Sequence, residues 1–431
     1  MESRFISQRH SAAIHVARNT ARHGGDDEAQ TSASSSLLKP SAQLTMDRFL
    51  QDLAHAEQPP VEFPPQYHTG RVPNSKAGDG KPRLLLMGQR RSGKSSISSV
   101  VFHKLPPSET LYLETTYRIK KESMQYVAYL AHTRIYETIT KADSSFMDFQ
   151  VWDLPGHLDY FDPAFDTDNI FEEIGALIWV IDAQDEYLDA IARLNMTILN
   201  LQQSYPNINI EVFVHKVDGL SDDFRGDTFR DIIQRVQDEL SDHGYEQAPI
   251  SFYQTSIYDH SIFEAFSKVI QKLIPQLPTL EALLNNLCGA CNIEKAYLFD
   301  IMSKIYIATD TSPTDIGSYE ICSDYIDVVI DVSEIYGWDR PDELEDETET
   351  GNNDAESLIT MEKKNSRYLY LREINKYLAL VCIMGQDNPA EKKAIIDYNV
   401  GVFQAGLKQV FPKSDREAQV EIRNIHDGGE Q

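Results

Sequence analysis

The sequence of 431 residues predicts an α/β domain with a mainly parallel open sheet and helices on both faces, followed by a smaller α+β domain. Three observations carry this prediction. Short apolar runs alternate with helical patterns over residues 81–278, a phosphate-binding motif joins the first run to the first helix, and the pattern changes to paired strands after residue 278. Ligands of parallel sheets bind at the carboxyl ends of the strands, which is where this motif lies.

The strands of the first domain are predicted from short apolar runs bounded by turn residues. They are expected at residues 84–87, 149–152, 176–181, 210–214 and 250–253. Helical patterns lie between these runs, and such alternation is typical of βα units and a parallel sheet.

The second domain begins where the stretch LIPQLPTL ends the alternation. A helix is expected over residues 279–291, a hairpin at 295–302 and 304–309, and further strands at 367–372 and 377–384. One helix face is expected to carry Ile321, Tyr325, Val328, Val329 and Val332, and a last helix to carry Ile395, Tyr398, Val402, Leu407 and Val410. Residues 279–415 are therefore predicted to form an α+β domain.

The flanking segments and one internal segment are polar. Residues 1–80 are rich in Ser, Ala, Arg and His and then in Pro, Gly and Lys, and apart from a short helix at 44–53 they are predicted to be a disordered extension. Residues 416–431 are predicted to be a disordered tail. The acidic segment 339–356 is predicted to be a solvated loop, with a contact for a basic partner as the alternative.

Composition excludes several classes of protein. The net charge of −27, from 40 basic and 67 acidic residues, argues against nucleic-acid binding, which needs a basic face. No apolar run approaches the roughly 18 residues of a membrane span, and no secretory or lipidation signal is present, so we expect no direct membrane insertion. Of the four cysteines, Cys288 and Cys291 form a CxxC pattern, for which helix packing is favoured over a metal or redox role.

The phosphate-binding motif is GQRRSGKS at residues 88–95, which matches G-x-x-x-x-G-K-[ST]. Backbone amides and the helix N-terminus of such a loop wrap nucleotide phosphates, and Gly88 and Gly93 let the chain approach them closely. Lys94 is expected to reach the outer phosphates and Ser95 to bind Mg²⁺. The other nucleotide contacts expected here are Arg91, Ser92 and Ser96. An ordinary glycine-containing loop is disfavoured because four specified positions coincide with a strand-turn-helix context.

Three later motifs, each at a strand end, indicate GTP rather than ATP. In WDLPG, Asp153 is expected to reach the metal through water and Gly156 to sense the terminal phosphate. In HKVD, Asp218 can accept both N1–H and N2–H of guanine, a pattern that adenine does not offer. The amides expected at the guanine carbonyl are those of Ser256 and Ile257. Each motif alone could be a strand cap, but their order favours a guanine-nucleotide site.

In this order, the stretches GQRRSGKSS, WDLPG, HKVDGLSDD and TSIYDHSIFEAFSKVIQKLIPQLPTLE resemble the Rag GTPases, specifically the C/D class with its fungal members. The likeness covers residues 81–415, and VIDAQDEY, SKIYIATDTSP and YIDVVIDVS extend it. It implies a Ras-like P-loop GTPase domain over residues 81–278. It also implies a roadblock-type, longin-like dimerisation domain over residues 279–415.

The resemblance implies partners as well. Members of the class pair obligately with a Rag A/B-class subunit and are served by a GTPase-activating protein. The heterodimer is bound through a lipid-anchored scaffold complex to the cytoplasmic face of the vacuolar or lysosomal membrane, with the cytoplasm and nucleus as further locations. There it relays amino-acid sufficiency to the target-of-rapamycin kinase complex.

Further site residues come from the resemblance. Thr116 matches the switch threonine that binds Mg²⁺, with Thr115 as the neighbouring alternative, and Lys216 with Asp218 matches the base pocket. His215 stands where most small GTPases have asparagine, and the C/D class itself has histidine there. A buried capping histidine is the alternative interpretation. His157 occupies the place of the glutamine that orients the attacking water. Slow, partner-dependent hydrolysis of GTP to GDP is favoured over a site without turnover.

Residues 122–141 lengthen the segment between Thr116 and Asp153 beyond what a two-stranded hairpin needs. A partner-binding helix, a mobile insertion or an error of gene annotation would each account for them, and the last two are favoured equally. Three functions remain open at this point. A GTP/GDP switch leads, a nucleotide-bound scaffold without turnover is the first rival, and a P-loop ATPase or kinase is the second.

Overall fold

The computed structural model describes residues 83–123, 149–158, 160–161, 170–171, 174–205, 208–245, 248–301, 303–335, 356–362, 367–374, 378–385 and 392–410. These form two compact units, the first running to Pro275 and the second starting at Gln276. The expectations for residues 1–80, 416–431 and 339–355 lie outside the described residues. Of the segment 122–141, only residues 122 and 123 are described, and both belong to a strand.

The first unit contains a six-stranded sheet in the order β2-β3-β1-β4-β5-β6. Its strands are β1 (Arg83–Gly88), β2 (Lys120–Ser123), β3 (Gln150–Asp153), β4 (Ile174–Asp182), β5 (Asn209–His215) and β6 (Ile250–Thr255). Neighbours are parallel except β2 and β3, so the mainly parallel sheet is confirmed. The sequence did not predict β2, because KKES contains no apolar run.

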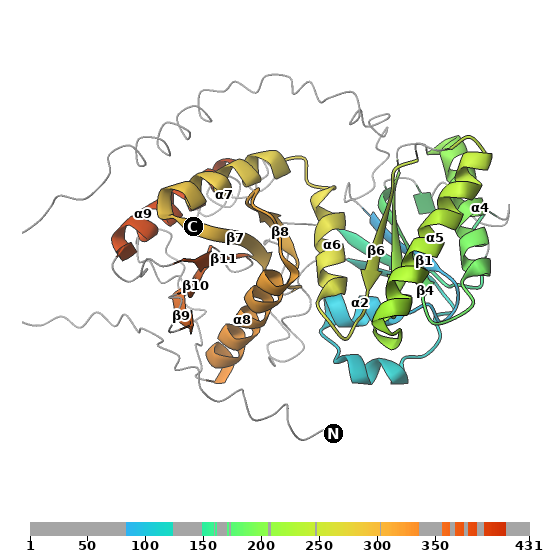
Figure 1. The fold of residues 1–431 in the computed structure, drawn as a ribbon, viewed down its shortest axis with the longest axis horizontal. Helices are drawn as coiled ribbons and strands as arrows, with labels where there is room; N and C mark the ends of the chain where they lie inside the picture. The colour runs from blue at the N-terminus through green and yellow to red at the C-terminus, as the bar shows by residue number, and fades with distance from the viewer. Residues whose placement is uncertain are drawn as a thin grey trace, which may run out of the picture. The chain divides into compact units, whose positions relative to one another are not determined.

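Helices cover both faces of this sheet (Figure 1). They are α2 (Lys94–His103), α4 (Leu188–Ser204), α5 (Asp222–Asp242) and α6 (Ser261–Gln271), with short 3₁₀ helices η2 (Pro107–Tyr112) and η4 (Val217–Gly219). Helices α2 and α6 share one face, where the Phe102 and Phe213 rings both pack edge-on against Phe266. Helices α4 and α5 cover the other face over a core that includes Leu194 and Val236. The carboxyl ends of the parallel strands are thereby left open at one edge.

The second unit is an antiparallel sheet with helices, in the order β8-β7-β11-β10-β9. Its elements are α7 (Leu277–Cys291), β7 (Ile293–Asp300), β8 (Tyr306–Thr309), α8 (Ile316–Ile335), β9 (Glu356–Glu362), β10 (Arg367–Glu373), β11 (Leu378–Met384) and α9 (Lys393–Val410). Helices α7 and α9 lie together on one face and α8 on the other (Figure 1). Strand β9 was not predicted, because its sequence ESLITME contains only a short apolar run.

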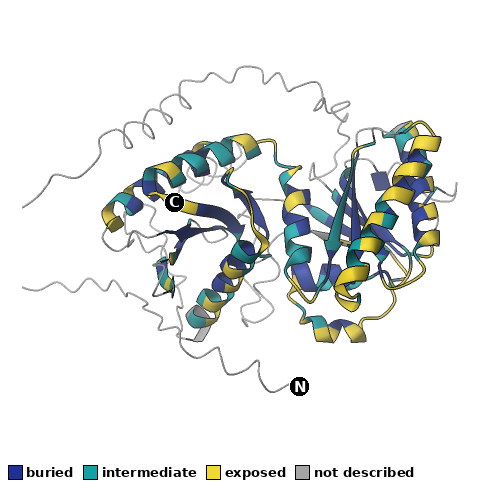
Figure 2. Cartoon of the chain, in the orientation of Figure 1, coloured by how far each residue is buried: buried dark blue, intermediate teal, exposed yellow. Residues whose placement is uncertain are grey.

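Helix α8 buries only part of the face that the sequence predicted. Tyr325 of that face is 3% exposed, but Ile321 and Val328 are each 41% exposed. The other residues that the helix buries are Tyr319, Cys322, Ser323 and Ile326. Because apolar side chains cover most of the circumference of α8, periodicity alone could not select the core face. The predicted face is therefore partly exposed within this chain (Figure 2).

All four cysteines are free and belong to the second unit. Burial raises the pKa of the Cys288 thiol to about 12 and that of Cys291 to about 11, so both are protonated at neutral pH. This agrees with helix packing as their role. Within the described ranges, no group of three or more His, Cys, Asp or Glu side chains could hold a metal ion. None of the described helices is long and apolar enough to cross a membrane.

Candidate nucleotide-binding site

The phosphate-binding motif forms the turn between β1 and α2. Gly88 has φ 136° and Gly93 has φ 105°, conformations that side chains rarely permit. A Cβ at Gly88 would lie 2.3 Å from the carbonyl oxygen of Val180, so both space and backbone require glycine there. Arg91 adopts a left-handed conformation as well, with φ 69°. Ser92 is buried and Ser96 is half-buried in the first turn of α2.

The Lys94 side chain lies inside this loop. Its Nζ donates hydrogen bonds to the carbonyl oxygens of Gly88 at 2.9 Å and Gln89 at 2.7 Å. Burial lowers the Lys94 pKa to about 8, a shift that Asp153 opposes and the positive charge of Arg193 assists. The ammonium is still mostly protonated at neutral pH, so a positive charge is held where the motif predicts phosphates.

Three oxygen-bearing side chains from distant parts of the sequence meet beside Lys94. The Ser95 hydroxyl at the start of α2 donates to Asp153 Oδ2 at 2.5 Å and lies 2.8 Å from Thr116 Oγ1. The Thr116 hydroxyl lies 3.2 Å from the same carboxylate oxygen. Thr115 instead accepts a hydrogen bond from Arg90 at 3.4 Å. The structure thus brings together the three residues predicted to hold a metal, and it places Thr116 rather than Thr115 among them.

These residues fit Mg²⁺, which prefers hydroxyl and carboxylate oxygens. The second oxygen of the Asp153 carboxylate, Oδ1, is buried and has no hydrogen-bond partner among the described residues. A buried unpaired carboxylate oxygen is costly unless a cation or water satisfies it.

Gly156 packs directly on the phosphate loop. A Cβ at this position would lie 2.5 Å from the Arg90 nitrogen and 2.7 Å from the Gly88 carbonyl oxygen. The next residue, His157, is exposed, and its ring meets Tyr117 edge-on with 6.2 Å between centroids. The segments that follow β3 and precede β2 therefore touch each other at the place predicted for catalysis.

His215 ends β5 and is buried under the phosphate loop. Its Nδ1 is 3.0 Å from Thr255 Oγ1, and a Cβ on Gly93 would lie 2.6 Å from the imidazole. Burial and the neighbouring Lys216 lower the His215 pKa to about 4, although Asp218 opposes the shift. The ring is therefore neutral at physiological pH and acts as a packed, hydrogen-bonded support, which agrees with the capping interpretation.

Lys216 connects the strand ends to the phosphate loop. It has φ 63°, and its Nζ donates to the Arg91 carbonyl oxygen at 2.8 Å and to Asp182 Oδ2 at 2.5 Å. Asp218 is exposed, and its Oδ1 accepts a hydrogen bond from the buried Ser256 hydroxyl at 2.6 Å. Ile257 follows in the turn after β6. The residues predicted for the base pocket therefore lie in two adjacent loops.

Comparison with known proteins was decisive for the family. Residues 83–326, more than half of the chain, match the Gtr1/RagA G protein conserved region. The chain belongs to the Gtr1/RagA family. It is 55% identical over 332 residues to GTP-binding protein gtr2 of Schizosaccharomyces pombe, covering 77% of this chain and 98% of that protein. To Ras-related GTP-binding protein C of Homo sapiens it is 53% identical over 335 residues, covering 78% of each.

Other Gtr1/RagA relatives are more distant. Ras-related GTP-binding protein B of Rattus norvegicus is 26% identical over 257 residues, covering 56% of this chain and 67% of that protein. The resemblance to the C/D class of Rag GTPases is thus confirmed. Members of this G-protein family bind GTP and GDP, so the chain has a GTP-binding role.

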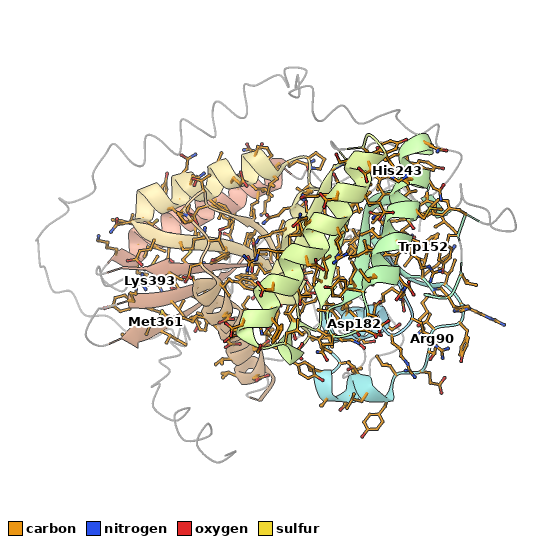
Figure 3. All side chains as sticks on the ribbon, turned by 45° about the vertical axis from the view of Figure 1, so that its right-hand side comes forward. Arg90, Trp152, Asp182, His243, Met361 and Lys393 are labelled. Atoms are coloured by element: carbon orange, nitrogen blue, oxygen red, sulfur yellow. The ribbon has the colours of Figure 1, made fainter. Side chains whose placement is uncertain are left out.

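Several residues of this Gtr1/RagA chain contact the predicted site but were not predicted from the sequence. They are Asp182, Gln184, Tyr160, Arg193 and Thr255. Gln184 donates to the carbonyl oxygen of Lys216 at 2.7 Å and supports its left-handed backbone. The stretch VIDAQDEY, which contains Asp182 and Gln184, was a signal for the family, but no pattern in it specifies these contacts. Arg90 and Asp182 can be followed in Figure 3.

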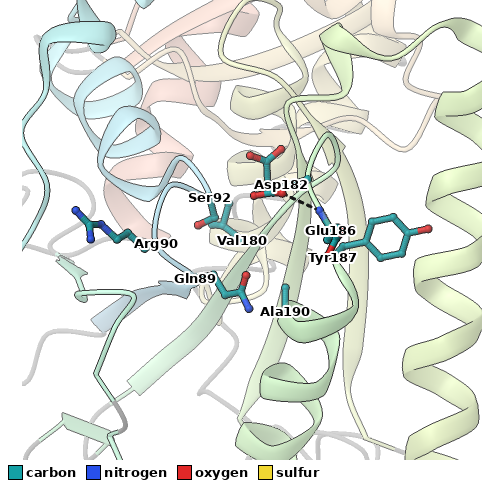
Figure 4. A pocket seen from close by; sticks show the side chains of 9 residues that line it. Gln89, Arg90, Ser92, Val180, Asp182, Glu186, Tyr187 and Ala190 are labelled. Atoms are coloured by element: carbon teal, nitrogen blue, oxygen red, sulfur yellow. Dashed lines mark hydrogen bonds between the residues drawn. The ribbon is translucent and has the colours of Figure 1, made fainter.

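A small hollow lies beside the phosphate loop of this family member (Figure 4). Its walls come from the loop, from the end of β4 and from the start of α4. The lining residues are Gln89, Arg90, Ser92, Val180, Asp182, Asp185, Glu186, Tyr187 and Ala190. Three of them, Asp182, Asp185 and Glu186, carry carboxylates. Among the described contacts, Asp182 forms an ion pair with Lys216. With one guanidinium, Arg90, against three carboxylates, the lining carries an excess of negative charge, which disfavours phosphates there.

Proposed function

We propose that this chain is a guanine-nucleotide-dependent molecular switch that acts as the C/D-class subunit of a Rag-type heterodimer. One observation carries the proposal: Ser95, Thr116 and Asp153 meet around one point beside Lys94. The first belongs to the phosphate loop, and the other two belong to the segments that a terminal phosphate orders in GTPases. A ligand bound there would contact all three segments at once and could set their conformation.

Magnesium is the metal proposed for this point. Ser95 and Thr116 would hold it directly and Asp153 through water. When bound, Mg²⁺ supplies positive charge to the phosphate oxygens. Removal of Mg²⁺ with a chelator is expected to weaken retention of nucleotide by the purified chain, measured as the release rate of a fluorescent GDP analogue. An unchanged release rate would contradict the metal assignment.

Guanine selection is assigned to Asp218, supported by its contact with Ser256. Competition of GDP against ADP for the purified chain tests it, because a P-loop ATPase or kinase would prefer ADP. Asp218→Asn is expected to shift preference toward xanthosine diphosphate, whose base presents a carbonyl oxygen where guanine presents N2–H. Asp227→Asn, in an exposed pair with Arg230, is the matched control and is expected to keep guanine preference.

GTP hydrolysis is proposed to be slow and dependent on a partner. His157 is the residue assigned to the attacking water, and imidazole can act as a proton acceptor near neutral pH. In this structure its ring is exposed and lies edge-on against Tyr117, so no contact with the phosphate loop fixes its position. Useful rates are therefore expected only when a GTPase-activating protein orders the site and supplies an arginine.

A nucleotide-bound scaffold without hydrolysis is the second candidate, favoured by the exposed position of His157. Single-turnover measurement with preloaded GTP distinguishes the two functions. The switch requires phosphate release that an activating protein accelerates and that His157→Ala abolishes. A scaffold would release no phosphate with or without the activator.

The second unit is proposed to be a roadblock-type domain that pairs with a Rag A/B-class subunit. Support comes from its antiparallel sheet between helices and from the half-exposed apolar side chains of Ile321 and Val328 on α8. Expression of the full chain alone and together with such a subunit tests pairing. A soluble monomer that ignores the second subunit would contradict it.

The cellular role proposed for the heterodimer follows from family membership. It would be held by a scaffold complex at the vacuolar or lysosomal membrane and would relay amino-acid availability to the target-of-rapamycin kinase complex. Imaging of the tagged chain with a vacuolar marker, in cells with and without amino acids, tests the location. Phosphorylation of a target-of-rapamycin substrate in cells lacking the chain tests the relay, and an unchanged response would contradict it.

A further inference from the structure

Two side chains hold the backbone on either side of Gly156. The phenolic hydroxyl of Tyr160 donates to the Pro155 carbonyl oxygen at 2.8 Å. The guanidinium of Arg193, on α4, donates to the Gly156 carbonyl oxygen at 3.1 Å. Each acceptor belongs to one of the two peptide groups that flank Gly156, so one group is held by a side chain later in the same loop and the other by a side chain on α4.

Because the peptide group is planar, a contact that fixes its carbonyl also fixes the direction of its N–H. In a trans peptide the N–H points opposite to the C=O of the same group. The Tyr160 contact therefore sets the direction of the Gly156 N–H, and the Arg193 contact sets that of the His157 N–H. Without these contacts a glycine would leave the two groups free to rotate, because it has the widest choice of backbone conformations.

The two anchors are built differently. Tyr160 is 4% exposed and belongs to the core beneath α4, so its hydroxyl has a fixed position. Arg193 is exposed, so its side chain does not serve to fill the core. Its charge lies near enough to the phosphate loop to lower the pKa of Lys94. An exposed arginine directed at a backbone carbonyl beside the loop indicates a role in the site rather than in packing.

Gly156 lies so close to the phosphate loop that a Cβ would be 2.5 Å from the backbone of Arg90. At this approach, a rotation of either flanking peptide changes which group faces the phosphates. Preset donors cost no reorganisation when charge arrives, which is why fixed backbone amides are efficient anion ligands.

We propose that Tyr160 and Arg193 are positioning residues that preset the Gly156 and His157 amides for the terminal phosphate of a nucleoside triphosphate. The inference rests on the proposed switch function and deepens it. A diphosphate carries no group at that point, so the two hydrogen bonds contribute more to triphosphate affinity than to diphosphate affinity. Helix α4 thereby becomes part of the element that distinguishes GTP from GDP.

The test compares the dissociation constants of GTPγS and GDP for the purified full-length chain, co-purified with a Rag A/B-class subunit if it needs one. Tyr160→Phe and Arg193→Gln each remove one hydrogen bond and are expected to weaken GTPγS binding about three- to tenfold relative to GDP. Arg193→Lys, which keeps a donor and the charge, is expected to recover part of the loss. If the partner subunit is present, its own nucleotide site is loaded with the same nucleotide in every measurement, so that differences between dissociation constants come from this chain.

Matched controls remove similar groups elsewhere in the first unit. Tyr187→Phe loses a hydroxyl contact with Asp231 at 2.8 Å, and Arg235→Gln loses a contact with the same carboxylate at 2.7 Å. Both are expected to keep the wild-type ratio of the two dissociation constants.

The outcomes separate the inference from the function beneath it. A wild-type chain that binds no guanine nucleotide overturns the proposed function. A wild type that binds both nucleotides, with variants that keep its ratio or lose both affinities equally, overturns the positioning role alone. Arg193→Gln keeps the test valid should Tyr160→Phe fail to fold, because the arginine is exposed.

Discussion

Gly156→Ala is the substitution for which the structure makes the sharpest prediction. The added Cβ would meet the Arg90 nitrogen and the Gln89 carbonyl carbon at 2.5 Å, and ordinary contact begins at 3.4 Å. The two segments would have to separate by about 0.9 Å, and neither obstructing atom belongs to a side chain that can turn away. Overpacking of this kind costs about 1–3 kcal/mol, and a backbone obstacle places this case at the upper end.

The expected result is a selective loss of triphosphate binding. In the proposed switch, the Gly156 amide must approach the phosphate loop to reach a terminal phosphate. A cost of about 2–3 kcal/mol corresponds to GTPγS binding weaker by about 30- to 150-fold. GDP does not require this approach, so its dissociation constant is expected to change by less than about threefold.

The assay is displacement of a fluorescent guanine nucleotide by GTPγS or GDP from the purified chain, with the thermal midpoint measured in parallel. Gly226→Ala is the control, because Gly226 lies within α5 and an added Cβ meets only the Arg230 side chain, at 3.8 Å. That variant is expected to keep both affinities and to be slightly more stable. Wild-type GTPγS affinity in Gly156→Ala would refute the argument that close approach is required.

Three further predictions concern pH, a buried ion pair and the metal residues. The pKa of His215 is about 4 in the folded chain and about 6.5 in the unfolded chain, so as pH drops through this range the unfolded chain binds a proton that the folded chain does not. The free energy of unfolding is therefore expected to fall by about 3 kcal/mol between pH 6.5 and pH 4. Urea unfolding should show this loss in the wild type and not in His215→Gln. Lys272→Met leaves the 1% exposed Glu211 carboxylate without its ion pair and should cost about 2–4 kcal/mol in the same measurement, whereas Lys272→Met combined with Glu211→Gln should recover part of it. Thr116→Ala should weaken Mg²⁺-dependent GTPγS binding about tenfold while Thr115→Ala does not, and equal effects in a binding assay would contradict the placement of Thr116.

The sequence predicted the parallel sheet because its strands are buried on both faces and read as continuous apolar runs. Strand β2 was not predicted for the opposite reason, since it is a polar edge strand whose place in the sheet comes from its pairing with β3. Helix α8 has apolar residues over most of its circumference, with an acidic stripe on the remaining side, so contact with the sheet decides which of them are buried. In each case the missing information is tertiary contact rather than local preference.

In the candidate site, too, some residues could be predicted from local sequence patterns and others depend on tertiary contacts. Gly88, Lys94, Ser95 and Asp153 could be predicted because phosphate and metal chemistry fixes their type and spacing. The residues that hold them could not. Arg193 contacts a backbone carbonyl, and any donor of suitable length on α4 could do so. No motif specifies such a residue.

These supporting contacts join the two ends of the site. Lys216, placed in the base pocket by its motif, donates to the Arg91 carbonyl oxygen in the phosphate loop, and the His215 ring fills the space beside Gly93. The loops for base and phosphate therefore cannot move independently, because a shift of one breaks a hydrogen bond or opens a gap in the other. In the proposed switch, base recognition would therefore stabilise the conformation of the phosphate loop. It follows that a variant of Lys216 should weaken binding of GDP and GTP alike, whereas variants around Gly156 should separate them.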